Sequence, residues 1–557
     1  MPELSWTLRG LSSREEVQRA RLTELLSQAG WRFGDRASAA SSDVAMVWAN
    51  DRLSSEQARF LQHRLEARRP ILLLGRTVTS DLSDEPILQE ASGIVPRAWM
   101  SPHPARLRPE GAEGWAQRVA PLDGELELVT SVLTVDKQRD SVESWVTAPV
   151  GLSRQPVVTW NPDAAVGVFA AAAEAASADS TNDLGLIGRL LHLVLRRIVG
   201  VDPTAAPRPL SVGLLGFGAI GAEHARAIVD LPGLDLSVVC DRNEERLAQA
   251  SLLSPDVTVT TDARSLLEGD ADLIVVSTPP DTHAEWATRM MAGGKDVIVE
   301  KPFALTTDEA DHVIDDAHAQ GRRVVTYQNR RYDPDFLAVR NAIGTGRIGD
   351  LFHLETFVGG YGHPCNYWHS DEEVSGGAIY DWGSHVLDQI LQLHPAPIAH
   401  VTAIEHKRKW LDVTNADHTS LHIRFKDGVE ASFTHSDLAS ALKPRWLALG
   451  TEGALSSRWR AESVIARTEI GTLHEDRLAA TDSPPDVFLH GIDGSETTLV
   501  LPTPPTHPFH RELVDDLLFG WPMSVTAGQS RRVVAVMEAA RASAQSAGEP
   551  VEVDGEL

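Results

Sequence analysis

A glycine-rich turn between two apolar runs constrains the fold of this chain more than any other feature. Residues 212–241 read VGLLGFGAIGAEHARAIVDLPGLDLSVVCD. The apolar runs Val212–Leu215 and Leu236–Cys240 are typical of buried strands. The segment between them has the G-x-G-x-x-G spacing, with its glycines at Gly216, Gly218 and Gly221. This order predicts a strand, a tight turn, a helix and a second strand.

Each glycine of this turn has a physical role in binding a dinucleotide. Gly216 allows the tight turn, Gly218 allows the backbone to approach a pyrophosphate, and Gly221 allows the helix to pack on the strand. The helix that begins at Ala219 offers free N–H groups and its positive dipole end to phosphates. Asp241, about 20 residues after the last glycine, supplies a carboxylate for ribose hydroxyls. A plain strand-to-helix turn, the alternative, requires neither the second strand nor this carboxylate.

Length and composition exclude several classes of protein. A chain of 557 residues predicts three or four domains, and 42% hydrophobic with 23% charged residues is typical of a soluble globular protein. A net charge of −27 argues against a sequence-independent nucleic-acid binder, which needs a basic face. The two cysteines, Cys240 and Cys365, make neither a disulfide framework nor a cysteine-rich zinc site, and they favour a reducing cytoplasm.

The N-terminal region predicts neither a signal peptide nor a membrane-spanning helix. The first residues, MPELSWTLRG, lack the basic-then-apolar layout of a signal peptide. The most hydrophobic helical stretch, Leu184–Val199, is interrupted by one histidine and three arginines, so it is too short and too charged to span a bilayer. We expect it to be an amphipathic helix on a soluble core.

Residues 1–200 are expected to form a separate domain. Helical and strand patterns alternate in it, which predicts a small doubly wound, flavodoxin- or amidotransferase-like α/β layer. The expected helices are Arg14–Gln28, a helix capped by Ser54 or Ser55 that runs to about Ala67, the alanine-rich Ala170–Ala176, and Asp183–Val199; the expected strands are Asp43–Ala49, Pro70–Leu74 and Val157–Trp160.

This N-terminal order resembles the trehalose-utilisation (ThuA-like) branch of the glutamine-amidotransferase-like fold. Two departures bear on its chemistry. The chain has no cysteine before Cys240, so the amidotransferase nucleophile is absent. The strand that ends at Gly75 continues as RTVTS, without the histidine–glycine pair of that branch. We therefore expect a non-catalytic domain with a binding, regulatory or assembly role.

Three further segments follow. Residues 201–209, VDPTAAPRP, have the composition of an extended linker. Residues 210–330 are expected to form the dinucleotide-binding Rossmann domain. Residues 331–557 are expected to form an α+β domain whose mostly antiparallel sheet binds substrate and supports a homo-oligomer. Its expected strands are Leu351–Val358, His400–Glu405, Thr419–Phe425, Val429–Thr434 and Trp446–Gly450, and its late helices Pro508–Leu518 and Ala527–Ala547.

Polar side chains follow successive strands of the predicted Rossmann domain. Its later strands are Asp272–Ser277, Val297–Val299 and Val324–Tyr327. Open parallel sheets bind ligands at the carboxyl ends of their strands. The polar residues at these ends are Asp241, Thr278, Glu300, Lys301, Gln328 and Asn329. Their position at one edge of the sheet predicts a ligand site there.

Residues 210–550 resemble the Gfo/Idh/MocA oxidoreductase family. The resemblance rests on GFGAIG at 216–221, TPPDTH at 278–283, EKPFALT at 300–306 and GGAIYDWGSHVLDQ at 376–389. The run YQNRRYDPDF at 327–336 is most similar to the branch of inositol and scyllo-inositol dehydrogenases. The resemblance implies these cofactor-binding residues: Gly216, Phe217, Gly218, Ala219, Ile220, Gly221, Asp241, Arg242, Thr278, Pro279, Pro280, His283, Glu300, Lys301 and Gln328.

Two neighbouring residues, Asp241 and Arg242, favour different cofactors, NAD and NADP. The resembling branch often uses NADP. Asp241 repels a 2′-phosphate, whereas Arg242 beside it could hold one. We expect NAD, with NADP as the alternative.

Lys301, Asp381 and His385 are the candidate catalytic residues. Lys301 follows a strand and precedes a proline that fixes the local backbone, and its ammonium can stabilise a developing alkoxide. Asp381 and His385 share one helix face, where a carboxylate can tune an imidazole as a general base. Taken alone, Lys301 would also fit an ordinary surface lysine, and His385 would also fit a histidine whose hydrogen bonds are made within the fold. The family resemblance implies that His385 is the base, that Asp381 orients it or holds substrate, and that Lys301 contacts cofactor and substrate.

The remaining site residues are expected around this set. Gly376 and Gly377 permit close approach to a nicotinamide. Candidate substrate contacts besides the catalytic set are Arg330, Trp368 and His369, although Trp368 fits a core position equally well. Asp388 faces either the site or a domain interface. The spacing of His363, His369 and His385 fits no tetrahedral metal site, so no metal is expected.

These observations predict a cytoplasmic NAD(P)-dependent dehydrogenase that acts on a secondary hydroxyl of a sugar, sugar derivative or cyclitol. Two alternatives stay open. An NAD-dependent glycosidase would oxidise its sugar transiently, and a nucleotide-sensing scaffold would bind NAD without catalysis. The sequence does not name the substrate, because individual hydrogen bonds in the pocket decide it.

Overall fold

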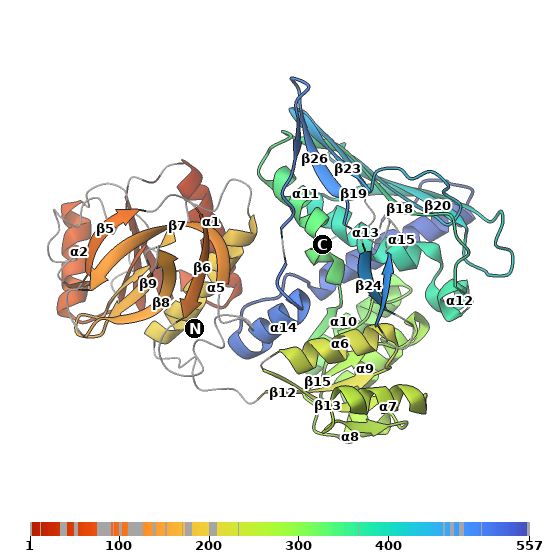
Figure 1. Ribbon diagram of the computed structural model, residues 1–557, viewed down its shortest axis with the longest axis horizontal. Coiled ribbons are helices and arrows are strands. Elements are labelled where there is room, and N and C mark those ends of the chain that lie inside the picture. Colours follow the sequence, from red (N-terminus) through yellow and green to blue (C-terminus); the bar gives the residue numbers. More distant parts are fainter. Residues whose placement is uncertain are drawn as a thin grey trace. The chain divides into compact units, whose positions relative to one another are not determined.

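The chain divides into two compact units. One contains Met1–Arg208 with Arg511–Pro522 and is called the N-terminal unit below; the other contains Pro209–His510 with Met523–Leu557 and is called the oxidoreductase unit (Figure 1). The structure is a computed structural model, and it describes residues 3–9, 11, 13–33, 42–49, 54–74, 91–92, 94–99, 103–109, 126–137, 141–150, 153–169, 171–172, 181–199, 209–231, 233–365, 367–459, 463–467, 473–477, 484–502 and 504–553.

A parallel sheet forms one half of the N-terminal unit, as the alternating pattern predicts. Its order is β10-β4-β3-β1-β2, and the strands of β3 and β4 are almost fully buried. The strands are β1 (Glu3–Arg9), β2 (Arg32–Phe33), β3 (Val44–Ala49), β4 (Ile71–Leu74) and β10 (Val166–Phe169), and the helices α1 (Ser13–Gln28), α2 (Ser55–Glu66) and α5 (Thr181–Ile198). A capping box between Ser54 and Gln57 starts α2, where the serines predicted it.

The other half of this sheet is antiparallel and was largely missed by the sequence analysis. Its strands are β5 (Ile94–Trp99), β6 (His103–Pro109), β7 (Leu126–Lys137), β8 (Glu143–Val150), β9 (Ser153–Asn161) and β11 (Ala171–Ala172). The predicted helix at 170–176 is wrong at Ala171 and Ala172, which pair with Val132 and Ser131 of β7. Cross-strand pairing overrides the helix propensity of alanine there. Gly75, the RTVTS run, residues 173–176 and linker residues 201–208 lie outside the described residues.

The C-terminal segment 511–522 groups with the N-terminal unit. Helix α14 spans Pro508–Phe519, and Trp521 follows it. The Trp521 ring lies 5.6 Å from the ring of His192 on α5, and a methyl group added at Gly188 would lie 3.1 Å from Trp521. This tryptophan therefore packs directly on α5.

A six-stranded parallel sheet forms the first domain of the oxidoreductase unit and confirms the predicted Rossmann fold. Its order is β14-β13-β12-β15-β16-β17, which reverses between β12 and β15. The strands are β12 (Leu210–Leu215), β13 (Leu234–Cys240), β14 (Thr258–Thr260), β15 (Leu273–Val276), β16 (Asp296–Val299) and β17 (Val324–Thr326). The helices are α6 (Ala219–Asp230), α7 (Glu244–Leu253), α8 (Arg264–Glu268), η3 (Pro280–Thr282), α9 (His283–Ala292) and α10 (Thr307–Gln320).

An eight-stranded sheet forms the second domain, and only its β18–β21 pair is parallel among the described pairings. Its order is β19-β20-β21-β18-β22-β23-β26-β27. The strands are β18 (Leu351–Gly359), β19 (Ile398–His406), β20 (His418–Phe425), β21 (Glu430–Ser436), β22 (Trp446–Gly450), β23 (Gly453–Arg458), β26 (Asp486–Gly491) and β27 (Glu496–Thr498); β24 (Ser463–Arg467) and β25 (Leu473–Arg477) pair separately.

Helices cover one face of this sheet (Figure 1). On β21, Ala431 and Phe433 belong to the core under the helices, so Thr434 and Ser436, one residue out of phase, face the other side. The helices are η4 (Asn329–Tyr332), α11 (Pro334–Gly344), η5 (Trp368–Ser370), α12 (Glu372–Ser375), α13 (Ala378–Leu393) and α15 (Ala527–Gln545). In the part of the chain that the structure describes, none of the helices has the length and apolar character needed to cross a bilayer.

Candidate active site

The glycine turn has the geometry that a dinucleotide phosphate requires. Gly216 has φ +94°, and a Cβ on it would lie 2.4 Å from the carbonyl oxygen of Ser277. A Cβ on Gly221 would lie 2.4 Å from the carbonyl oxygen of Gly216. A Cβ on Gly218 would meet nothing within 4 Å, and no side chain caps the first turn of α6 that follows it. The open space and the free N–H groups at this turn fit a bound phosphate.

Asp241 is buried at the end of β13, beside this turn. Its Oδ2 accepts a 2.6 Å hydrogen bond from the Phe217 amide, and its Oδ1 accepts one of 2.8 Å from the Asn243 amide. These bonds fix the carboxylate at the end of β13, and its contact with a ribose stays a prediction. Arg242 is exposed, whereas Arg246 on α7 reaches to 3.6 Å from Asp241 Oδ2. Sequence reasoning missed Arg246, although it lies one helical turn after Arg242.

Thr278 and His283 connect two of the family motifs within the Rossmann domain. Thr278 Oγ1 lies 2.7 Å from Thr282 Oγ1. The two ring nitrogens of His283 each lie 2.8 Å from a backbone carbonyl oxygen, that of Pro302 and that of Thr278. Burial lowers the pKa of His283, while the two carbonyl oxygens, which can only accept, act to raise it because they favour a ring that donates from both nitrogens. The ring thus braces the TPPDTH segment against the EKP segment, and its contact with a cofactor stays a prediction.

Glu300 joins a buried chain of side chains that the sequence did not reveal. Its Oε1 lies 2.8 Å from His224 Nε2, and its Oε2 accepts a 3.1 Å hydrogen bond from the Lys301 amide. His224 Nδ1 in turn lies 2.8 Å from His510 Nε2. Burial, and then the charges of His224 and His507, hold the pKa of His510 well below its ordinary value. This chain fixes the backbone at the start of the EKP segment.

Lys301 and Asp381 form an ion pair across the two domains of the oxidoreductase unit. Lys301 Nζ lies 2.7 Å from Asp381 Oδ1, and His369 Nε2 lies 3.7 Å from the same oxygen. Burial acts to raise the pKa of Asp381, but the charges of Lys301 and His369 outweigh it and hold that pKa well below its ordinary value. Asp381 is therefore ionised and directs its carboxylate to Lys301.

His385 lies one helical turn after Asp381 on α13 and is buried. Its Nδ1 has no hydrogen-bond partner among the described residues. Burial, and then the charges of Lys301 and Arg330, hold the pKa of His385 well below its ordinary value. The imidazole is thus neutral at neutral pH and has a ring nitrogen available to accept a proton.

The other residues predicted to contact ligands differ in whether their side chains are accessible or are engaged with other residues of the protein. The side chain of Trp368 is exposed, which excludes the core reading. Arg330 lies over the ring of Trp382 at 4.4 Å from its centroid. Gln328 Nε2 donates to the carbonyl of Ser384 at 3.2 Å and so joins the Rossmann domain to α13. Asp388 makes bonds of 2.5 and 2.7 Å with the Arg331 guanidinium, in a fully buried pair, so it is closed to ligands.

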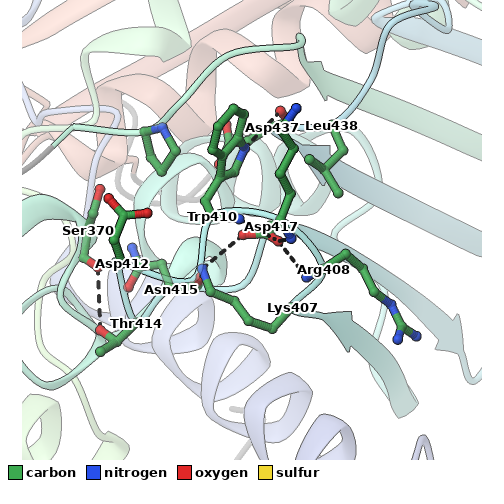
Figure 2. A network of polar contacts seen from close by, with 12 residues as sticks. Ser370, Lys407, Arg408, Trp410, Asp412, Thr414, Asn415, Asp417, Asp437 and Leu438 are labelled. Carbon is green, nitrogen blue, oxygen red and sulfur yellow. Dashed lines mark hydrogen bonds and ion pairs between the residues drawn. The ribbon is translucent and has the colours of Figure 1, made fainter.

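The loop 407–417 contacts η5, the segment that carries Trp368 and His369, where Thr414 donates to the carbonyl of Ser370 (Figure 2). At its base, the buried Asp417 accepts bonds from Lys407 Nζ at 2.8 Å and from the Arg408 and Lys409 amides at 2.6 Å each. Burial acts to raise the pKa of Asp417, but these donors lower it to about 2. Asn415 Nδ2 then donates to the carbonyl of His369 at 3.0 Å. No motif in the sequence marked this loop.

His435 and Asp437 at the end of β21 also went unnoticed in the sequence. His435 is buried, its Nε2 lies 3.9 Å from Asp437 Oδ1, and its Nδ1 has no hydrogen-bond partner among the described residues. Its charge lowers the pKa of Asp381, and Asp381 in turn raises the pKa of Asp437, which burial already raises. Both groups therefore lie within electrostatic reach of the Lys301–Asp381 pair. The alternation of side chains along β21 could have revealed His435, because it lies on the same face as the core residues Ala431 and Phe433.

His363 and His369 each face a different acidic residue. His363 Nε2 lies 2.8 Å from Asp412 Oδ2, and His369 faces Asp381. Within the described ranges, no group of three or more histidine, cysteine, aspartate or glutamate side chains is arranged to hold a metal ion.

Two family models match this chain. One is described as "Oxidoreductase family, NAD-binding Rossmann fold" and matches residues 210–328; the other is the GFO/IDH/MocA C-terminal domain and matches residues 336–456. These two ranges contain the glycine turn, Lys301, Asp381 and His385.

Two similar proteins each match about 60% of this chain. The uncharacterized oxidoreductase YdgJ of Escherichia coli (strain K12) is 27% identical over 338 residues, 59% of this chain and 94% of that protein. The scyllo-inositol 2-dehydrogenase (NADP(+)) IolW of Bacillus subtilis (strain 168) is 24% identical over 342 residues, 60% of this chain and 94% of the relative.

Among solved structures, GenD2 from gentamicin A biosynthesis, in complex with NAD, aligns with a TM-score of 0.52 at 24% identity and covers 63% of this chain and 97% of that chain. At 24% sequence identity, this structural similarity shows that the two proteins share a fold. With the motifs, the sheet order and both family models in agreement, the chain from residue 210 to residue 456 belongs to the Gfo/Idh/MocA oxidoreductase family, whose first domain binds NAD.

Proposed function

We propose that this oxidoreductase is a dehydrogenase that oxidises a secondary hydroxyl of a sugar, sugar derivative or cyclitol. One observation carries the proposal. A lysine ammonium, paired with an ionised aspartate, lies at the end of a Rossmann strand, and a neutral histidine with an unpartnered nitrogen lies one turn from that aspartate. An ammonium and a neutral imidazole are what the oxidation of an alcohol requires.

Each side chain has a distinct role in this mechanism. A substrate hydroxyl between Lys301 and His385 transfers its proton to the free imidazole nitrogen. The Lys301 ammonium stabilises the alkoxide that develops on the same oxygen. Asp381 holds the Lys301 ammonium in place through their 2.7 Å contact. NAD, when bound at the glycine turn, supplies the acceptor for the hydride that leaves the carbon.

The substrate class rests on the surroundings of the catalytic set. The exposed Trp368 offers an apolar ring face, while Arg330 and His369 offer polar groups, a combination that suits a polyhydroxylated ring. The name of the relative from Bacillus subtilis, a scyllo-inositol dehydrogenase, supports a cyclitol or a similar ring. The fixed carboxylate of Asp241 supports NAD, while the NADP named for that relative keeps NADP as the alternative.

The test is a panel of cyclitols, sugars and sugar derivatives offered with NAD and with NADP, with reduction followed by the absorbance of the reduced nicotinamide. Wild type should reduce NAD with at least one ring polyol. Lys301→Met should bind NAD, as measured by calorimetry, without reducing it. His422→Gln, at an exposed position on β20, is the matched control and should keep full activity.

Two outcomes would replace the proposal. Hydrolysis of a glycoside that requires NAD but accumulates no reduced cofactor would indicate a glycosidase with transient oxidation. Tight NAD binding with no reduction across the panel would indicate a nucleotide-sensing protein.

A further inference from the structure

A row of three buried side chains connects segments of the oxidoreductase unit that lie far apart in the sequence. His224 lies on α6, the helix that begins at the glycine turn, and its side chain is fully buried. Its Nε2 lies 2.8 Å from Oε1 of Glu300, the residue that follows β16. Its Nδ1 lies 2.8 Å from Nε2 of the buried His510 on α14. The mechanism proposed above uses none of these three side chains.

The two ring nitrogens of His224 have different partners and different roles. A carboxylate accepts hydrogen bonds, so His224 Nε2 donates to Glu300. Burial and the neighbouring histidine charges hold the pKa of His510 well below its ordinary value, so the ring of His510 is neutral. A neutral ring can donate to His224 Nδ1 or accept from it. In both cases Nε2 of His224 carries the proton that Glu300 accepts.

The second oxygen of Glu300 acts on the backbone of Lys301. Glu300 Oε2 accepts a 3.1 Å hydrogen bond from the Lys301 amide, and Lys301 Nζ lies 2.7 Å from Asp381 Oδ1. A lysine ammonium stands on a flexible stem, so its position depends on where the backbone is held. Small displacements of a catalytic group can cost a large part of the rate. Glu300 is therefore placed to set the position of the Lys301 ammonium.

Aromatic side chains enclose this row. The centroid of the Tyr327 ring lies 4.2 Å from that of His224 and 5.5 Å from that of His510. Phe509 packs edge-on against Tyr327 at 4.8 Å. An apolar side chain would fill the place of His224 without the cost of burying a polar ring. Stability alone therefore does not require a histidine here, whereas its two directed bonds do.

We propose that His224 is a positioning residue for the oxidation. Through Glu300 it holds the Lys301 backbone where the ammonium can meet a substrate hydroxyl, and it ties that backbone to the helix that begins at the glycine turn. The inference rests on the proposed function, because it takes Lys301 as the group that stabilises the alkoxide. The effect on the rate passes through Nε2, while the bond from Nδ1 to His510 holds the ring in place.

Two substitutions separate the two nitrogens of His224. The amide nitrogen of glutamine can reach the position of Nε2, so His224→Gln keeps a donor for Glu300 and loses the bond to His510. The shorter amide of asparagine can reach only the position of Nδ1, so His224→Asn keeps a partner for His510 and loses the bond to Glu300. Each variant thus gives up one buried hydrogen bond, and circular dichroism will show that each folds.

The first measurement is kcat with NAD and a ring polyol that wild type oxidises. His224→Asn should be slower by roughly tenfold to a hundredfold, as expected for a misplaced catalytic group. His224→Gln should lose only a few-fold, which makes it the conservative rescue. His318→Asn is the matched control, because His318 is exposed on α10 of the same domain, and it should be as fast as wild type.

The second measurement needs no substrate. Hydrogen exchange at the Lys301 amide, followed by mass spectrometry with fragmentation to single residues, reports whether Glu300 still accepts its bond. The amide should exchange about tenfold faster in His224→Asn than in wild type, the usual effect of losing one hydrogen bond. It should exchange at nearly the wild-type rate in His224→Gln and in His318→Asn.

The failure of this inference is distinguishable from the failure of the proposed function. If Lys301→Met is inactive but His224→Asn is as fast as wild type, only the positioning role is wrong. Equal losses in His224→Gln and His224→Asn would leave His224 a packing role alone. If Lys301→Met oxidises the polyol normally, the proposed mechanism falls and this inference falls with it. If wild type oxidises none of the polyols, equal exchange of the Lys301 amide in all variants overturns the inference by itself.

Discussion

Helix α13 makes two ion pairs with segments that follow Rossmann strands, and the pairs differ in how far water is excluded. Near its start, Asp381 pairs with Lys301 after β16, and the two side chains are 26% and 18% exposed. Two turns later, Asp388 pairs with Arg331 after β17, and both side chains are 2% exposed. The same helix and the same kind of charge therefore give one pair that a substrate can reach and one that it cannot.

The geometry of each pair agrees with its accessibility. The ammonium of Lys301 makes a single short contact and keeps donors for another oxygen. The guanidinium of Arg331 uses two nitrogens on Asp388 and a third contact, at 2.6 Å, on the carbonyl of Ser524. The first arrangement leaves capacity for chemistry, while the second ties α13 to η4 and to the segment before α15. The burial of each aspartate on α13 therefore separates a role in the site from a role in holding the fold together.

The largest effect is expected at the open end of the helix. His385→Ala should lose on the order of 10²–10⁴ in kcat, the usual contribution of a positioned acid–base group. NAD affinity should be nearly unchanged, because we expect residues 216–221 and Asp241 to hold the cofactor. Stopped-flow oxidation of the substrate found in the panel and calorimetry with NAD measure the two quantities.

Lys301→Ala is the companion variant and should be at least as slow, because the charge that stabilises the alkoxide is gone. The double variant should lose much less than the product of the single losses, since the two groups act as a unit. Near-normal turnover of His385→Ala on the true substrate would show that another residue is the base.

Breaking the buried Asp388–Arg331 pair should lower the stability of the protein. Asp388→Ala leaves a buried guanidinium without its counter-charge, so it should lower the free energy of unfolding by about 3–5 kcal/mol. Asp381→Ala, at the half-open pair, should lower it by only about 0–1 kcal/mol but should slow oxidation strongly. Urea titrations of both variants test the contrast. Equal destabilisation by the two substitutions would mean that exposure does not separate the pairs.

The pH dependence of oxidation follows from the depressed pKa of His385. Its ordinary value is about 6.5, and burial with the neighbouring charges lowers it. The base must be neutral to accept a proton, so kcat/KM should already be flat at about pH 6.5 and should fall about tenfold per unit only below the lowered pKa of His385. A pH–rate profile that still rises above pH 7.5 would assign the ionisation to another group.

The two regions around this helix also differ in how well the sequence predicted them. The sequence predicts the glycine turn, Asp241, Lys301, Asp381 and His385 as site residues because each lies in a short motif whose local geometry follows from the spacing, and their roles stay predictions. The structure adds a contact between Lys301 and Asp381, which are 80 residues apart and whose pairing cannot be read from spacing, while the charge of Asp381 still acts to raise the pKa of His385.

The wall around the catalytic set was not predicted. Asp417, Asn415 and His435 come from a loop and a strand far from the motifs, and only the sheet order brings them to η5 and α13. The same holds for the antiparallel half of the N-terminal sheet, whose strands depend on pairing with β7. Local patterns predict elements and motifs well; side chains that meet through tertiary contacts leave little trace in the sequence.

Cofactor choice is a smaller effect, at the other end of the site. Asp241→Ser removes the carboxylate that would repel a 2′-phosphate and leaves Arg242 and Arg246 beside the space. We expect the ratio of kcat/KM for NAD to that for NADP to fall by about tenfold or more, since one charged contact is lost and one repulsion is relieved. A wild-type enzyme that already prefers NADP would contradict the basis of this prediction.

The smallest effect is expected at His435, which tests whether the end of β21 belongs to the substrate site. The ring is buried, and its Nδ1 is unpartnered among the described residues, so replacing it should change the free energy of unfolding little. If that nitrogen binds a substrate hydroxyl, His435→Gln should raise KM by about three- to tenfold, the effect of one hydrogen bond, while kcat changes less than twofold. His422→Gln on β20, exposed on the opposite face, is the matched control and should change neither constant. A fall in kcat with KM unchanged would instead place His435 in proton transfer beside His385, and unchanged constants in both variants would remove the end of β21 from the site.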